Sequence, residues 1–127
     1  DEVEYSVDDL TGKLEPAEAS RLLKIAEWEL EKTTHWDRDE LSPVFQRMSE
    51  VEDLKLKELL RLFFVAISGS TVSLPLFDGM ALLGPDLSRT RIRKALEKLS
   101  DAGSGLSKKG LKSLEKEYRE AYGNRID

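Results

Sequence analysis

Apolar and polar residues follow a helical period over most of the chain. Between residues 16 and 33, apolar positions return every three or four residues, as they do on the buried face of a helix. Pro16 suits the first turn of this helix, where its missing N–H leaves no hydrogen bond unmade. The apolar face consists of Ala19, Leu22, Leu23, Ala26 and Leu30.

Two similar stripes predict the second and third helices. The second helix follows Trp36, and the Ser42-Pro43 pair marks either its start or a kink near it. The third helix begins at Lys55 and ends before Gly69, a residue type that commonly terminates helices. It is the more apolar of the two, so we expect it to be the most buried helix. The two stripes are Val44, Phe45 and Met48, and then Leu56, Leu59, Leu60, Phe63, Phe64, Val65 and Ile67.

An uncharged, hydroxyl-rich loop over residues 69–75 precedes a short fourth helix. Ser73 is well placed to cap this helix, which would begin near Leu74-Pro75. Gly84 is expected to end it, because glycine readily leaves the helical conformation. Its apolar side chains are Leu76, Phe77, Met80 and Leu83.

Two further helices are predicted after this point. The fifth begins at Asp86 or Ser88 and ends at Ser100. Residues 101–105 (DAGSG) have the composition of a flexible hinge. Ser107 can cap the last helix. The apolar faces of the two helices are Ile92, Ala95, Leu96 and Leu99, and then Leu111, Leu114, Tyr118, Ala121 and Tyr122.

These segments predict an all-α protein, a compact bundle or cage of about six helices. Residues 16–100 would form the helical domain, and residues 101–127 a hinge plus a C-terminal helix packed on it. Residues 1–15 are acidic and show no clear period, so we predict that they are the end of a linker. No run of residues is typical of a strand.

Composition narrows the possible functions. The chain has 127 residues, of which 39% are hydrophobic, enough for a core and too many for a disordered tail. It has no cysteine and only one histidine, His35, which excludes cysteine metal sites and sites with several histidines. No stretch is long enough to cross a bilayer, and a signal-peptide pattern is absent. We therefore expect a monomeric cytoplasmic domain without metal, cofactor or membrane partner.

The charge is unevenly distributed. The net charge of −5 argues against a general nucleic-acid binder. Residues 84–127 hold 11 Lys/Arg and 7 Asp/Glu, a charge of +4, while the rest holds 9 and 18, a charge of −9. A basic RNA-binding face in the last third and a solvated helix surface explain this pattern equally well.

The loop and its flanks form an ordered motif: residues 66–77 are AISGSTVSLPLF, and residues 80–84 are MALLG. This motif resembles the C-terminal anticodon-binding domain of glutamyl-tRNA synthetases, whose members typically have A-L-T-G-x-x-x-S/T-P-P/G-L-F and then L-L-G. Trp36, Leu41 and Lys55 also match the family. The resemblance covers residues 36–99 firmly and residues 1–35 loosely. Class I lysyl-tRNA synthetases are the nearest relatives to exclude.

The resemblance implies a helical cage that holds the anticodon loop of tRNA(Glu), or also that of tRNA(Gln). In this family, glutamate is attached to tRNA by an upstream catalytic domain that uses ATP and Mg²⁺. That domain carries H-x-G-H-like and K-M-S-K-S-like motifs, and neither occurs in this chain. We therefore expect no catalytic residue here.

The resemblance places anticodon recognition in the uncharged loop. RNA loops are bound by packing unstacked bases on side chains and by hydrogen bonds to base edges. In the family, the positions of Ser73, Leu74 and Leu76 contact the first anticodon base. We expect Leu76 to face the base and Phe77 to enter the core, while Ser73 also has a purely structural role open to it as a helix cap. The candidate RNA-binding residues are Ser70, Thr71, Ser73, Leu74 and Leu76.

The chain departs from the family pattern at two positions. Phe64 stands where many members have an arginine that faces the anticodon, and Leu74 replaces a usual proline. Arg61, one turn before Phe64, is the candidate substitute. Further candidate phosphate contacts, which solvation alone would also explain, are Arg47, Arg89, Arg91 and Arg93.

Two other functions remain open on the sequence alone. A protein–protein interaction module without RNA binding would account for the acidic N-terminal part and for the helix with Tyr118 and Tyr122. A self-contained enzyme would need acidic pairs such as Glu50/Glu52, which lie in polar segments. A titration with tRNA separates the first hypothesis from RNA recognition.

Overall fold

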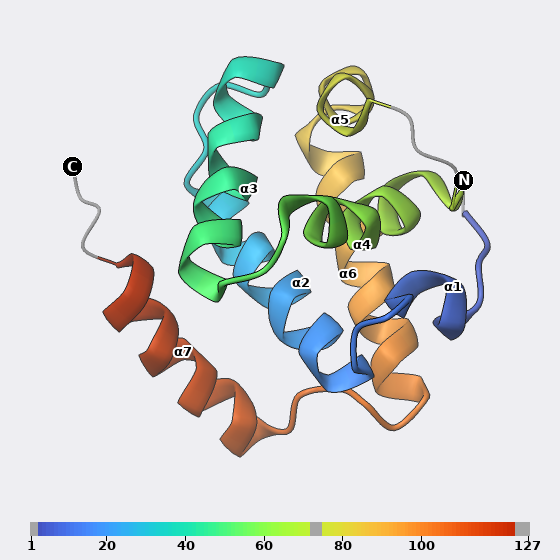
Figure 1. The fold of residues 1–127 in the computed structure, drawn as a ribbon, viewed down its shortest axis with the longest axis vertical. Helices are drawn as coiled ribbons and strands as arrows, with labels where there is room; N and C mark the ends of the chain where they lie inside the picture. The colour runs from blue at the N-terminus through green and yellow to red at the C-terminus, as the bar shows by residue number, and fades with distance from the viewer. Residues whose placement is uncertain (1–2, 72–74, 124–127) are drawn as a thin grey trace.

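The structure, a computed structural model, describes residues 3–71 and 75–123. These residues form helices and no strand (Figure 1), so the prediction of an all-α protein is confirmed. The helices are α1 (Val7–Thr11), α2 (Pro16–Glu31), α3 (Arg38–Glu52), α4 (Leu56–Ser68), α5 (Leu76–Leu83), α6 (Pro85–Asp101) and α7 (Lys108–Tyr122).

Helix α4 is the centre of the core, and in Figure 1 it crosses the middle of the molecule. It packs against α1, α3, α5 and α6. Its buried residues run without interruption from Leu62 to Ile67, so it is apolar on nearly all sides, as the sequence predicted. The helix ends at Gly69, whose φ of +76° lies in the left-handed region that glycine adopts without strain.

Helices α2 and α6 pack along each other beneath α4. The predicted apolar face of α2, from Ala19 to Leu30, is fully buried. Helix α6 contributes Ile92, Ala95 and Leu99 to the same core. The periodicity of the sequence therefore identified the inner faces of both helices correctly.

The N-cap residue Asp37 fixes the start of α3. The side chain of Asp37 accepts a hydrogen bond from the N–H of Glu40 at 3.0 Å, and the helix begins at Arg38. Pro43 therefore lies inside the helix and does not start it. The cap predicted for α5, Ser73, lies outside the described residues, and α5 begins at Leu76.

Helix α1 was missed by the sequence analysis, which treated residues 1–15 as the end of a linker. The Ser6 hydroxyl accepts a hydrogen bond from the N–H of Asp9 at 2.9 Å, and the Asp9 carboxylate accepts one from the N–H of Ser6. This capping box begins a helix whose Leu10 is 0% exposed. Because α1 packs on α4 and α6, this segment belongs in part to the core.

Helix α7 lies along the outside of α2 and α3 and is attached by long side chains. Ser107 caps it, as predicted, by accepting a hydrogen bond from the N–H of Gly110 at 2.9 Å. The Tyr118 hydroxyl donates to Glu29 of α2, and the Tyr122 hydroxyl donates to Glu52 of α3, both at 2.6 Å. Each tyrosine therefore satisfies a carboxylate that α7 covers.

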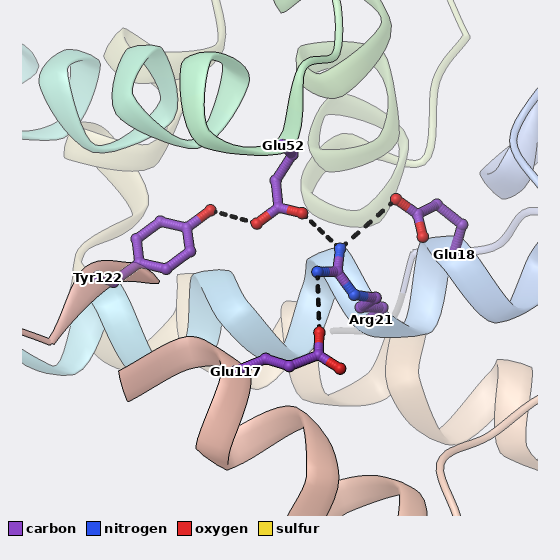
Figure 2. A network of polar contacts seen from close by, with 5 residues as sticks. All are labelled: Glu18, Arg21, Glu52, Glu117 and Tyr122. Carbon is purple, nitrogen blue, oxygen red and sulfur yellow. Dashed lines mark hydrogen bonds and ion pairs between the residues drawn. The ribbon is translucent and has the colours of Figure 1, made fainter. Parts of the chain in front are cut away.

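A network around Glu52 joins three helices (Figure 2). Arg21 of α2 binds Glu52 at 2.5 Å, and also lies within ion-pair distance of Glu18 and of Glu117 on α7. Burial, together with the hydrogen bond to Glu52, raises the pKa of Tyr122 above its ordinary value. A tyrosine with the ordinary pKa of about 10 is already protonated at neutral pH, and the raised pKa extends the hydrogen bond to Glu52 into more alkaline solution.

Candidate nucleic-acid interface

A groove of about 980 Å³ lies beside α4 and α5. Its walls also include the turn that joins α1 to α2 and the residues that start α3 and α4. Much of its lining is apolar, which suits the faces of unstacked bases. The apolar lining residues are Leu14, Leu56, Leu60, Phe64, Pro75, Leu76 and Phe77.

Two of the predicted RNA-binding residues, Thr71 and Leu76, line this groove. Thr71 is exposed, so its hydroxyl is accessible to a ligand. Ser70 is half-buried and its N–H donates to the Ser68 hydroxyl at 3.1 Å, which orients the start of the loop. Ser73 and Leu74 lie outside the described residues. The anticodon roles of all five residues stay predictions.

We expected Phe77 to enter the core and Leu76 to be the more exposed, but the structure shows the reverse. Leu76 is only 6% exposed, whereas Phe77 is half-buried and packs against Phe45 with ring centroids 5.6 Å apart. Because α5 starts at Leu76, this side chain belongs to the first turn of a helix that packs against α3 and α4. Both side chains nevertheless line the groove.

Arg61 and Phe64 reach the same groove from one side of α4. The Arg61 Nη1 atom is buried and has no hydrogen-bond partner within residues 3–71 and 75–123. It lies against Gly12, where an added Cβ would collide with the guanidinium. A desolvated cationic donor without a partner is unfavourable. Arg47, Arg89 and Arg91 each have such a nitrogen too, but their guanidinium groups also donate to carbonyls, whereas Arg61 makes no hydrogen bond within the described residues.

The other candidate arginines do not line the groove. Arg89 donates to the Leu30 carbonyl at 3.0 Å, and Arg91 donates to the Ile67 carbonyl at 2.6 Å. Both carbonyls belong to last turns of helices, which lack partners within the helix itself. These contacts are structural, and they compete with the phosphate binding predicted for Arg89 and Arg91.

Arg47 and Arg93 are placed differently from each other. Arg47 donates to the Tyr122 carbonyl at 2.8 Å and lies 3.6 Å from the Glu29 carboxylate, so it helps to attach α7. Arg93 is exposed on α6 and contacts Thr90 at 3.3 Å. Phosphate contacts by Arg47 and Arg93 remain untested predictions, and the internal contacts of Arg47 favour a structural role.

The groove contains four basic residues that the charge analysis did not point to: Lys13, Arg38, Lys55 and Lys57. With Arg61 they make five cations against the two carboxylates of Glu58 and Asp78, a formal charge of +3. The charge totals pointed to a basic face in the last third of the chain, because totals over long segments hide a cluster assembled from separate turns. Only Lys55 carried a signal, through its match to the family.

Both tryptophans make internal contacts. The Trp36 Nε1 atom donates to the Met80 carbonyl at 2.8 Å, and the Arg89 guanidinium lies over its ring. Trp28 packs on Tyr118 with ring centroids 4.9 Å apart. Both tryptophans are therefore held by packing between helices.

The described part of the chain has neither a metal-ligand cluster nor a membrane-spanning helix. It contains no cluster of three or more His, Cys, Asp or Glu side chains that could hold a metal ion. None of the helices that it describes has both the length and the apolar character needed to cross a membrane. His35 is exposed on the surface, next to Thr34.

The chain is similar to known proteins over most of its length. Glutamate–tRNA ligases of Marinobacter nauticus and Saccharophagus degradans are 40% and 42% identical to the chain over 107 residues. That of a Marinomonas species is 41% identical over 106 residues. These alignments cover 84% of this chain but only 20–21% of each relative, so the chain spans about a fifth of their length.

A family model also matches the chain. The model, described as an anticodon binding domain, matches residues 1–96. The match begins before α1 and ends within α6, so α7 lies beyond it. Because the match takes in most of the chain, this protein belongs to the anticodon-binding domain family.

Proposed function

We propose that this chain is the anticodon-binding part of a glutamate–tRNA ligase and that it holds the anticodon loop of tRNA(Glu) in the groove beside α4 and α5. The observation that carries the proposal is the groove itself. It combines apolar walls, an accessible hydroxyl on Thr71 and a formal charge of +3 within a chain of net charge −5. Apolar walls suit bases, and the cations suit the backbone that joins them.

The mechanism proposed is recognition without chemistry. Unstacked anticodon bases would pack on Leu76, Phe77 and Phe64, and Thr71 would hydrogen-bond a base edge. Arg61 would replace the arginine that family members carry at the position of Phe64. Binding energy at the anticodon would position the distant acceptor end of the tRNA, where the parent enzyme would attach glutamate using ATP and Mg²⁺.

The test measures tRNA binding and aminoacylation by the full-length protein that this reading frame encodes. Thr71→Ala is expected to weaken binding of tRNA(Glu) by about 1 kcal/mol, or roughly fivefold, through loss of one hydrogen bond. Ser113→Ala is the matched control, because Ser113 is an exposed hydroxyl residue on α7, away from the groove. Equal affinities for wild type and Thr71→Ala would remove Thr71 from the site.

Comparison of tRNA(Glu) with tRNA(Gln) in the same assay measures the breadth of recognition. A full-length protein that binds neither tRNA at low salt would refute the proposed function. Neither the family match nor the relatives point to a protein–protein interaction module, so that alternative gains no support.

A further inference from the structure

We propose that Lys13, Lys55 and Lys57 form a phosphate-binding rim, which holds the sugar–phosphate backbone of the anticodon loop while the apolar walls hold its bases. This inference rests on the proposed function and deepens it. It assigns a binding role to three lysines that neither the loop motif nor the charge distribution pointed to, although Lys55 also matched the family pattern. The rim is defined as these three side chains only.

The three lysines converge on the groove from two different turns. Lys13 lies between α1 and α2, whereas Lys55 and Lys57 lie at the start of α4, and all three line the groove. Each is exposed, and within the described residues none makes an ion pair or hydrogen bond with a carboxylate. They are therefore available to a ligand.

Several other cations of the fold are already engaged. Arg21, Lys24 and Arg47 pair with carboxylates, and Arg89 and Arg91 donate to backbone carbonyls. Within the groove itself, Arg38 lies 3.8 Å from Asp78. Attraction between exposed charges falls off over a Debye length of about 8–10 Å, so the three rim lysines act on a ligand in the groove far more than the acidic surface elsewhere does.

The rim and the hydroxyl loop lie at opposite ends of α4. Lys55 and Lys57 stand at its N-terminus, and Thr71 follows its C-terminus. A 13-residue helix is about 20 Å long, which gives a single strand of several nucleotides room to lie along the groove. Lysine ammonium groups contact phosphate as point charges without reading the base, so the rim would set affinity and leave base preference to the other end.

The experiment compares two triple variants with equal charge change in the full-length protein. One is Lys13→Gln, Lys55→Gln and Lys57→Gln in the rim. The matched control is Lys109→Gln, Lys112→Gln and Lys116→Gln, which are exposed lysines of α7 outside the groove. All six lysines are exposed, and circular dichroism with thermal unfolding checks that both variants fold. The affinity for an anticodon stem-loop of tRNA(Glu) is measured between about 50 and 200 mM salt.

The rim variant is expected to lower the slope of log K against log salt concentration by about 2, since each single-strand phosphate contact contributes roughly 0.7. The control variant is expected to keep the wild-type slope. Relative affinities for stem-loops with altered anticodon bases should stay the same in both variants.

Three results would overturn the inference. If the two variants lower the slope equally, or if the α7 variant lowers it more, the rim is not the phosphate site. If the rim variant changes base preference at constant slope, these lysines contact bases and not phosphates. In each case wild-type binding would persist and the proposed function would stand, whereas absence of wild-type binding would remove both.

Discussion

At the residue scale, Arg61 is expected to lower the stability of the fold while it strengthens tRNA binding. Its Nη1 atom is buried without a partner among the described residues, so it contributes a desolvation cost that no internal contact offsets. Arg89 is the structural counterpart, because its guanidinium donates to the Leu30 carbonyl and lies over the Trp36 ring. The two arginines are therefore expected to respond in opposite ways to the same substitution.

Arg61→Met is expected to leave the free energy of unfolding unchanged or to raise it by about 1 kcal/mol, because an apolar chain of similar length needs no partner. The same change is expected to weaken tRNA binding. Arg89→Met should instead lower the free energy of unfolding by about 1–2 kcal/mol and leave binding intact. Urea denaturation measures the stability of both variants, and tRNA titration measures their binding. Loss of stability in Arg61→Met would contradict the prediction.

At the element scale, α1 shows where periodicity ceases to be informative. A helix of five residues barely exceeds one turn, so it offers only two apolar positions, Val7 and Leu10, and no longer repeat. Its capping box depends on Ser6 and Asp9, and a short acidic segment of this kind also has the composition of a linker. In contrast, α2, α4 and α6 present several turns of apolar residues, and each was located within a few residues.

Leu10→Ala is expected to lower the free energy of unfolding by about 2–5 kcal/mol, since it removes a fully buried side chain between α1, α4 and α6. A true linker residue would change it by less than about 0.5 kcal/mol. Val3→Ala, at a half-buried position outside the helix, serves as the control. Denaturant unfolding of both variants decides whether α1 is part of the cooperative domain.

Only part of the groove could be predicted from the sequence, because most of its cations come from segments that are distant along the chain. The motif identified Thr71 and Leu76, because a single loop carries both. The cations Lys13, Arg38 and Lys57 come from three turns that are distant in sequence, and only packing of α1, α3 and α4 brings them together. Which of Leu76 and Phe77 is more buried depends on the residue at which α5 starts. A shift of one residue rotates a helical face by about 100°.

At the scale of the whole molecule, α7 is joined to the bundle by hydrogen bonds from tyrosines to covered carboxylates. The pKa of Tyr122 is raised, so its folded state releases the proton at higher pH than the unfolded state. The stabilisation is therefore complete below the ordinary tyrosine pKa of about 10 and is lost as pH rises above it. The folded protein should lose stability in alkaline solution.

Tyr122→Phe is expected to lower the free energy of unfolding at pH 7 by about 1–2 kcal/mol, because Glu52 loses a donor. It should also flatten the fall in stability between about pH 9 and 11. Unfolding curves across this range measure both effects. A variant that loses stability with pH as steeply as wild type would show that Tyr122 does not govern alkaline unfolding, and Tyr5, whose pKa is also raised by burial, would be the next residue to test.

The contact between Gly12 and Arg61 bears on how libraries of this domain would evolve in the laboratory. Selection for folding alone should discard the charge at position 61 but keep glycine at position 12, where φ is +57°. Selection for tRNA charging should keep both residues. Sequencing survivors of the two selections would thus separate, at one point of the groove, the demands of the fold from those of its ligand.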